Sequence, residues 1–175
     1  MELRFTPLSL AGLGALETEA LCLVVFRDER PPRGAVGLVD WRLCGRISEL
    51  LVSGDLRGDF DEALLMPPPE RRLAAERLLL CGVGPRDEVD LARVRALIER
   101  LVARLVALRV RTAAFALPHA SLPWLSPEQA IDLLLEATAP HTAQLDAVWV
   151  VDTEPAQRAM EPRVEYARRR AIHDG

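Results

Sequence analysis

Three side chains with chemical potential lie in one short loop that follows an apolar run. Residues 118–127 contain His119, Ser121 and Trp124 together with three prolines. A base, a hydroxyl group and a large apolar ring therefore lie within ten residues. A histidine and a serine can act as base and nucleophile. Positions two residues apart rarely meet in that way without a special turn, and a tryptophan between prolines more often packs or anchors an interface. We therefore expect a ligand or interface loop here.

A second candidate for a ligand or interface loop contains Gly82 and Gly84, which also follow an apolar run and precede Arg86. A Gly-x-Gly after a strand is half of a dinucleotide-binding fingerprint, but the third glycine is missing and Pro85 stiffens the turn. The alternative is a tight turn that needs a positive φ. We keep Gly82, Gly84 and Arg86 as candidate ligand or interface residues.

No group of residues has the spacing of a known catalytic or metal centre. Asp59, Asp61 and Glu62 lie on a glycine-containing loop and are expected to be solvated. All 22 basic residues are arginine, which excludes Schiff-base lysines and a P-loop. A hydrolase Gly-x-Ser-x-Gly motif is lacking. The histidines are too scattered for a metal site: His119, His141 and His173. We predict no catalytic residue, no metal, no cofactor and no enzyme activity.

The composition limits the classes of binding partner and the cellular compartment that we expect. A net charge of −4 and a pI near 5.5 argue against nucleic acid, and we expect a solvated helix face at Arg93, Arg100, Arg104 and Arg111. Three cysteines without Cys-x-x-Cys spacing are expected to be buried in a reducing compartment: Cys22, Cys44 and Cys81.

The apolar stretch 8–16 has only Arg4 as a basic flank, which makes a poor signal peptide. No apolar run reaches the roughly 18 residues of a membrane helix. We expect a cytoplasmic protein without membrane contact.

The expected elements alternate between strands and helices. Apolar runs predict strands at 2–8, 20–26, 63–66, 77–81, 112–117 and 146–151. Helical spacing and caps predict helices at 39–52, 91–108, 127–137 and from 155 onward, with Asp90 and Ser126 as N-caps. This order predicts one α/β domain over residues 1–175, a three-layer sandwich with a mixed, largely parallel sheet. Ligands bind beyond the carboxyl ends of such strands, here the loops 27–34, 82–87, 118–127 and 152–155.

Three segments resemble the N-terminal domain of the leucine aminopeptidases, the cytosol aminopeptidase family M17. They are 20–26 (ALCLVVF), 34–48 (GAVGLVDWRLCGRIS) and 78–84 (LLLCGVG), and the resemblance is strongest over residues 1–120. It implies a macro-domain-like fold. In that family the metals and catalytic residues belong to a C-terminal domain with an Asn-Thr-Asp-Ala-Glu-Gly-Arg string and essential lysines. This chain has neither, so no catalytic residue carries over.

Three functions remain open. The first is a non-catalytic, stand-alone domain for protein interaction or oligomer assembly, as a homo-oligomer or with a protein partner. The second is a macro-like binder of ADP-ribose or a related nucleotide. Against it, the sequence contains no asparagine, whereas macro domains that bind ADP-ribose use an asparagine-rich strand end. The third is a hydrolase that uses His119 and Ser121.

Overall fold

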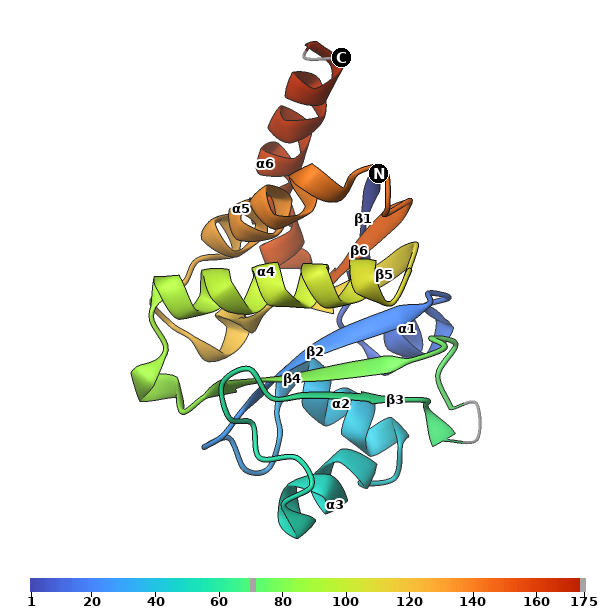
Figure 1. Cartoon of the computed structure of the whole chain (residues 1–175), viewed down its shortest axis with the longest axis vertical. Helices are drawn as coiled ribbons and strands as arrows, with labels where there is room; N and C mark the ends of the chain where they lie inside the picture. The colour runs from blue at the N-terminus through green and yellow to red at the C-terminus, as the bar shows by residue number, and fades with distance from the viewer. Residues whose placement is uncertain (70–71, 174–175) are drawn as a thin grey trace.

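Six strands form one twisted sheet at the centre of the molecule (Figure 1). The computed structural model describes residues 1–69 and 72–173, with side chains up to residue 170. The strand order is β1-β6-β5-β2-β4-β3. Neighbouring strands run parallel, except that β3 is antiparallel to β4. The strands are β1 Glu2–Pro7, β2 Ala20–Phe26, β3 Ala63–Met66, β4 Leu78–Gly84, β5 Thr112–Ala116 and β6 Ala147–Asp152.

Helices cover both faces of this sheet. One face carries α1 Leu10–Ala15, α2 Gly34–Arg42 and α3 Arg46–Ser53, and the other carries α4 Leu91–Ala107, α5 Pro127–Thr138 and α6 Glu154–His173. Short 3₁₀ turns lie at Arg86–Glu88, Pro118–Ser121 and Ala139–His141. The last turns of α6 extend beyond the rest of the molecule (Figure 1). The predicted three-layer α/β sandwich with a mixed, largely parallel sheet is confirmed.

The apolar runs explain which strands lie at the centre. Every residue of β2 and of β4 is buried, as expected for parallel strands that are covered on both faces. By contrast, the edge strand β3 alternates between exposed and half-buried residues. The helices contribute one apolar side each, and their side chains form two clusters of buried residues, one on each face of the sheet.

The predicted helix caps are confirmed. The Asp90 carboxylate accepts a hydrogen bond from the backbone N–H of Arg93 at 2.8 Å, and α4 begins at the next residue. Ser126 and Gln129 form a reciprocal capping box at the start of α5, where Pro127 occupies the first helical position.

Three segments differ from the prediction. The helix expected at 39–52 is two helices, because Cys44 (φ 55°) and Gly45 (φ 86°) adopt left-handed conformations that end α2 before α3 begins. The strand expected at 77–81 continues to Gly84. The segment 8–16, considered only as a leader, contains α1, whose first turn is capped by Ser9.

In the part of the chain that the structure describes, no helix is long and apolar enough to cross a membrane.

Candidate functional site

The carboxyl ends of four parallel strands meet at one edge of the sheet, which we call the carboxyl edge. Residues 27–30 follow β2, Gly84 to Arg86 follow β4, the turn Pro118–Ser121 follows β5, and Asp152 ends β6. Side chains from these segments touch one another across the edge. The topology therefore brings together loops that are far apart in the sequence, as expected for an open α/β sheet.

His119 and Asp152 form a buried pair at this edge. His119 Nε2 lies 3.1 Å from Asp152 Oδ2, and the two side chains are 7% and 6% exposed. The other oxygen of Asp152 accepts a hydrogen bond from the backbone N–H of Thr153 at 2.7 Å. His119 Nδ1 is buried and has no hydrogen-bond partner among the residues that the structure describes. The contact with Asp152 therefore favours the tautomer that carries its proton on Nε2.

Sequence reasoning missed this pair, because the two residues are 33 positions apart by their numbers. One signal could have found it. His119 follows β5, Asp152 ends β6, and adjacent parallel strands end side by side.

Glu29 is the centre of a second network at the carboxyl edge. Its Oε1 accepts a hydrogen bond from Ser121 Oγ at 3.1 Å and lies 3.8 Å from a terminal guanidinium nitrogen of Arg86. Arg86 also donates to Asp28 through its Nε at 3.1 Å and its backbone N–H at 3.0 Å. Partial desolvation acts to raise the pKa of Asp28, but the hydrogen bonds from Arg86 outweigh it and lower that pKa.

The two networks place His119 and Ser121 with different partners. His119 pairs with Asp152, while Ser121 donates its proton to Glu29. Because the partner of Ser121 is a carboxylate and not His119, the arrangement is not a serine–histidine pair. Glu29 is only 8% exposed, and its interactions are directed at the protein. In this geometry, the polar side chains of the carboxyl edge bind one another.

Gly82 and Gly84 lie inside β4, so the interpretation as a separate tight turn is wrong. At Gly82, an added Cβ would lie 2.1 Å from the carbonyl oxygen of Asp59, and the absence of a side chain permits that close approach. Gly84 does have a positive φ of 91°. The N–H groups of Gly82 and Gly84 donate to the carbonyls of Glu62 and Gly58, so neither is available to a phosphate.

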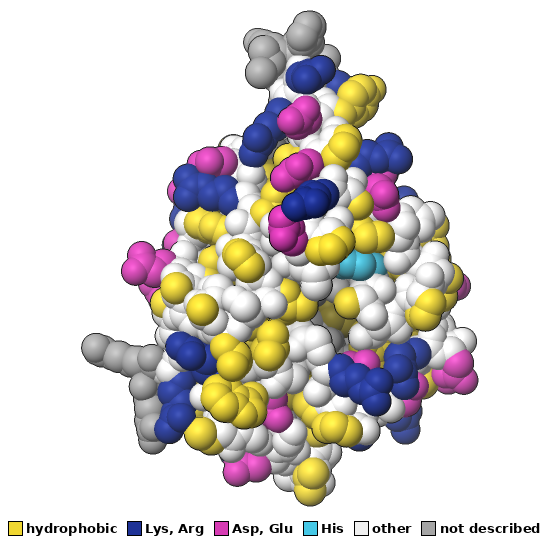
Figure 2. Space-filling model, turned by 180° about the vertical axis from the view of Figure 1, so that it is seen from behind, with side chains coloured by type: hydrophobic (Ala, Val, Ile, Leu, Met, Phe, Trp, Pro, Cys, Tyr) yellow, Lys and Arg dark blue, Asp and Glu magenta, His cyan; other side chains and the backbone are white. Residues whose placement is uncertain are grey.

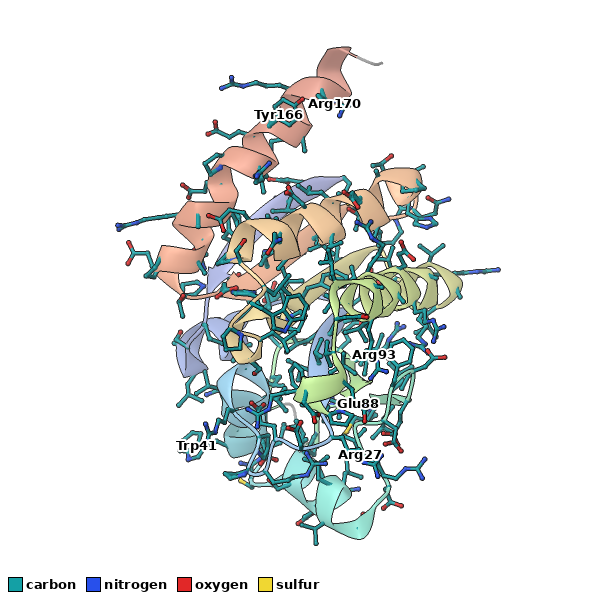
Figure 3. All side chains as sticks on the ribbon, turned by 90° about the vertical axis from the view of Figure 1, so that its left-hand side faces the viewer. Arg27, Trp41, Glu88, Arg93, Tyr166 and Arg170 are labelled. Carbon is teal, nitrogen blue, oxygen red and sulfur yellow. The ribbon has the colours of Figure 1, made fainter. Side chains whose placement is uncertain are left out.

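The acidic loop and the arginine face, both expected to be solvated, contact each other instead. Asp61 pairs with Arg100 at 2.7 Å and with Arg104 at 2.5 Å. Arg93 and Arg100 also lie over the ring of Phe60, with guanidinium carbons 5.3 and 5.0 Å from its centroid. Figure 3 shows Arg93 beside Glu88, with which it pairs at 3.4 Å.

The carboxylate of Glu62 accepts the backbone N–H groups of residues 57–59. Together these contacts hold the loop before β3 against α4 and organise it on the protein surface.

One cysteine also departs from expectation. Cys22 and Cys81 are buried, as predicted, but Cys44 is exposed, because it lies at the corner between α2 and α3. Burial raises the pKa of the Cys81 thiol to about 11 in spite of the opposing charge of Arg104. In the described chain, no group of three His, Cys, Asp or Glu side chains could hold a metal ion.

Two tryptophans are exposed. Trp124, the residue selected from the sequence, is 46% exposed, whereas its neighbours Leu122 and Leu125 are buried. Trp41 on α2 is more exposed, at 69%, and points away from the body in Figure 3. Sequence reasoning did not select Trp41, which lies within the helix expected at 39–52.

The arrangement of the elements defines a class of α/β domain that includes the macrodomains. A Trypanosoma brucei macrodomain superposes with a TM-score of 0.72 at 14% identity, covering 93% of this chain and 67% of that one. A mutant of tomato leucine aminopeptidase superposes with a TM-score of 0.65 at 14% identity, covering 96% of this chain and 35% of the enzyme.

The sequence assigns the chain within that class. Residues 23–135 match the N-terminal domain of the cytosol aminopeptidase family, and the chain belongs to this family. It is 30% identical over 140 residues to a probable cytosol aminopeptidase of Pseudomonas syringae pv. syringae. That alignment covers 80% of this chain and 27% of the relative, so the chain spans about a quarter of the length of its curated relatives. Only the N-terminal domain of the family is matched.

Proposed function

We propose that residues 1–175 form a single non-catalytic domain that acts in protein interaction or oligomer assembly. The observation that supports this proposal is the closed carboxyl edge. Its polar side chains bind one another, as His119 does with Asp152 and Ser121 with Glu29. An acid–base catalyst needs a titratable group within reach of a substrate atom. Here the only unpaired ring nitrogen described at that edge, His119 Nδ1, is buried.

The exposed aromatic residues support the interaction half of the proposal. Trp41 and Trp124 expose much of their indole rings, and Tyr166 on α6 is also exposed. Tryptophan and tyrosine are enriched at protein interfaces, where they bury a large area at little cost in side-chain entropy. The relatives are cytosol aminopeptidases, which supports a cytoplasmic setting for this interaction.

The alternative function is recognition of ADP-ribose or a related nucleotide. It is supported by the shared fold, since a Trypanosoma brucei macrodomain in complex with ADP-ribose superposes with a TM-score of 0.71. The carboxyl edge of this chain is a poor site for a diphosphate. It presents the carboxylates of Asp28 and Glu29, and prolines at 118 and 123 have no N–H to donate.

Sedimentation velocity of the purified chain over a range of concentrations tests the proposal. We expect an oligomer whose population rises with protein concentration. Trp124→Ala and Trp41→Ala should each weaken this association. The control is Arg158→Ala, which removes an exposed side chain on α6 and should weaken it less. A strict monomer that also binds no protein partner would contradict the proposal.

Calorimetry and a peptidase assay test the alternatives on the same preparation. We expect no heat with ADP-ribose and no release of amino acids from leucyl peptides. Micromolar binding of ADP-ribose would favour the nucleotide-binding function. Hydrolysis at an enzyme-like rate that His119→Ala abolishes would favour the hydrolase.

A further inference from the structure

The two edges of the sheet differ in their capacity to accept a further strand. At one edge, β3 has only four residues and is followed by prolines at 67 and 68, which have no N–H to donate. At the other edge, β1 has six residues. An edge strand with unpaired N–H and C=O groups is a template for pairing with another chain. The edge at β1 is therefore the better place for a further strand.

Alternate residues of β1 direct their backbone groups away from the neighbouring strand β6. The N–H of Glu2 donates to the carbonyl of Asp146 at 2.7 Å, and in a parallel pair every second residue repeats this bond. The backbone groups of Leu3 and Phe5 therefore point outward. In the described part of the chain, one of these outward groups has a partner, since the carbonyl of Leu3 accepts Arg168 Nη2 at 2.6 Å. A carbonyl has two lone pairs, so it can also accept the N–H of a further strand.

A hollow of about 330 Å³ lies beside this edge, between β1 and α6. Residues 2–5 form one side of the hollow, and α6 forms the other with Glu161, Val164, Glu165 and Arg168. Figure 2 shows acidic and basic side chains interspersed along the projecting part of α6. The helix thus leaves space beside the strand, and its surface carries charges of both signs.

The side chains of β1 alternate between apolar and charged residues. Leu3 and Phe5 pack into the cluster of buried residues that α6 also joins. Glu2 and Arg4 lie on the opposite side of the strand, where they pair at 2.6 Å and their side chains are 56% and 51% exposed. Arg4 also lies over the ring of Trp149, 5.4 Å from its centroid. One side of the strand is therefore apolar, and the other carries an acid and a base two residues apart.

We propose that β1 pairs with β1 of a second copy of this chain, antiparallel and about a two-fold axis at Leu3, so that two sheets become one. In this register Leu3 stands opposite Leu3 of the second copy, and Glu2 stands opposite Arg4. Cross-strand pairs of opposite charge are favourable, and the symmetry makes two of them. This inference rests on the proposed function in interaction or oligomer assembly, and it names the surface and the partner.

Charge complementarity selects both this occupant and this register. Glu2 and Arg4 are the charged residues of β1, and a second β1 centred on Leu3 matches both of them. An axis at Arg4 would place two arginines opposite each other, and an axis at Glu2 would place two glutamates opposite each other. Like charges directly opposite are destabilising. A strand without charges would form neither ion pair.

The proposed contact is separate from the exposed tryptophans. Trp41 lies on α2, and Trp124 lies in the loop before α5. A two-fold contact between identical surfaces closes with two copies. Association through a tryptophan would therefore add to the β1 dimer and would not replace it.

Charge-reversal variants of the full chain test the register. Glu2→Arg and Arg4→Glu each convert two pairs of opposite charge into two pairs of like charge. We expect each variant to dimerise about tenfold more weakly than the parent protein in sedimentation velocity. An equimolar mixture of the two variants should form a heterodimer with an affinity near that of the parent, because opposite charges face each other again. The ion pair within each strand stays broken in the mixture, so only a contact between chains explains the recovery.

Matched controls reverse an exposed ion pair elsewhere. Arg46→Glu and Glu49→Arg alter a pair on α3 whose side chains are 48% and 66% exposed, and they should leave dimerisation unchanged. Amide hydrogen exchange gives a second readout. The N–H groups of Leu3 and Phe5 should exchange more slowly at high protein concentration than at low concentration, because pairing protects them.

The contrary outcomes separate this inference from the proposed function. If each single variant weakens association and their mixture does not restore it, the reversals act within one chain and the inference is wrong. If the parent protein associates, neither reversal has an effect and Phe5 gains no protection, the copies meet elsewhere. In that case the proposed function stands and only the surface is wrong. A strictly monomeric parent protein overturns the inference, and the proposed function then stands only if the chain binds another protein.

Discussion

His119 Nε2 lies 3.1 Å from Asp152 Oδ2, and this contact joins the ends of two neighbouring parallel strands. Both side chains are almost completely buried, and Asp152 also accepts the N–H of Thr153 at the start of α6. The contact between His119 and Asp152 thus links the turn after β5 to the junction of β6 and α6. In a sheet of this kind, that is the edge where ligands commonly bind, but here the polar groups hold the protein together.

Loss of the Asp152 carboxylate should destabilise the domain. Asp152→Ala leaves the N–H groups of His119 and Thr153 without acceptors in a buried setting, which costs about 2–4 kcal/mol. Urea unfolding followed by circular dichroism measures the change. Asp152→Asn keeps a carbonyl acceptor and should cost less than the alanine variant. An alanine variant as stable as the parent protein would show that the pair contributes nothing to folding.

Gly82 should not tolerate a side chain. Gly82→Ala places a Cβ 2.1 Å from the carbonyl oxygen of Asp59, so β4 or the loop 58–62 must move, at a cost of roughly 2–4 kcal/mol. The control is Gly54→Ala, where φ is +83° but no atom lies within 4 Å. That variant meets only backbone strain, about 1 kcal/mol. Thermal unfolding compares the two, and equal costs would contradict the close approach at Gly82.

The three thiols should differ in reactivity. At pH 8 the native protein should react at once with a thiol reagent at Cys44, because Cys44 is exposed. Burial raises the pKa of Cys22 and of Cys81, the latter to about 11, so these thiols stay protonated and are shielded from the reagent. Denaturation in urea should release all three. Cys44→Ser should abolish the rapid reaction, and a rapid phase that persists in this variant would contradict the burial of the other two.

Acid should weaken the contact between the loop before β3 and α4. Partial desolvation acts to raise the pKa of Asp61, but hydrogen bonds and charges from Arg104 and Arg100 prevail and lower it. Since the pKa is lower in the folded state, this contribution is present above the unfolded value of about 3.9 and is lost as the pH falls through the folded value. Asp61 is 44% exposed, so solvent screening limits the contribution to about 1 kcal/mol or less.

Asp61→Asn should therefore lower the free energy of unfolding at pH 7 and approach the parent protein below about pH 4. Urea unfolding at a series of pH values measures this convergence. Glu49→Gln, which alters an exposed pair on α3, serves as the control and should show a smaller difference at pH 7. A difference at Asp61 that is constant with pH would contradict the ion pair.

Much of the architecture could be predicted from the sequence because its signals are local. The continuous apolar runs at β2 and β4 require cover on both faces, which leads to a parallel sheet between helices. Capping residues set the start of α4 and of α5, since the cap is a contact between neighbours in the chain. The break after α2 was missed, because helical spacing continues across Cys44 and Gly45 and nothing in the spacing reports a positive φ.

By itself, the sequence determined the alternation of elements and the three layers, because burial patterns and helix caps depend on residues that are neighbours in the chain. It also determined the family, because residues 23–135 match the family directly. Only the tertiary structure decided which polar groups meet. Asp61 and Arg104 are distant in the sequence, as are Ser121 and Glu29, and whether each is solvated depends on how the sheet edge brings their loops together.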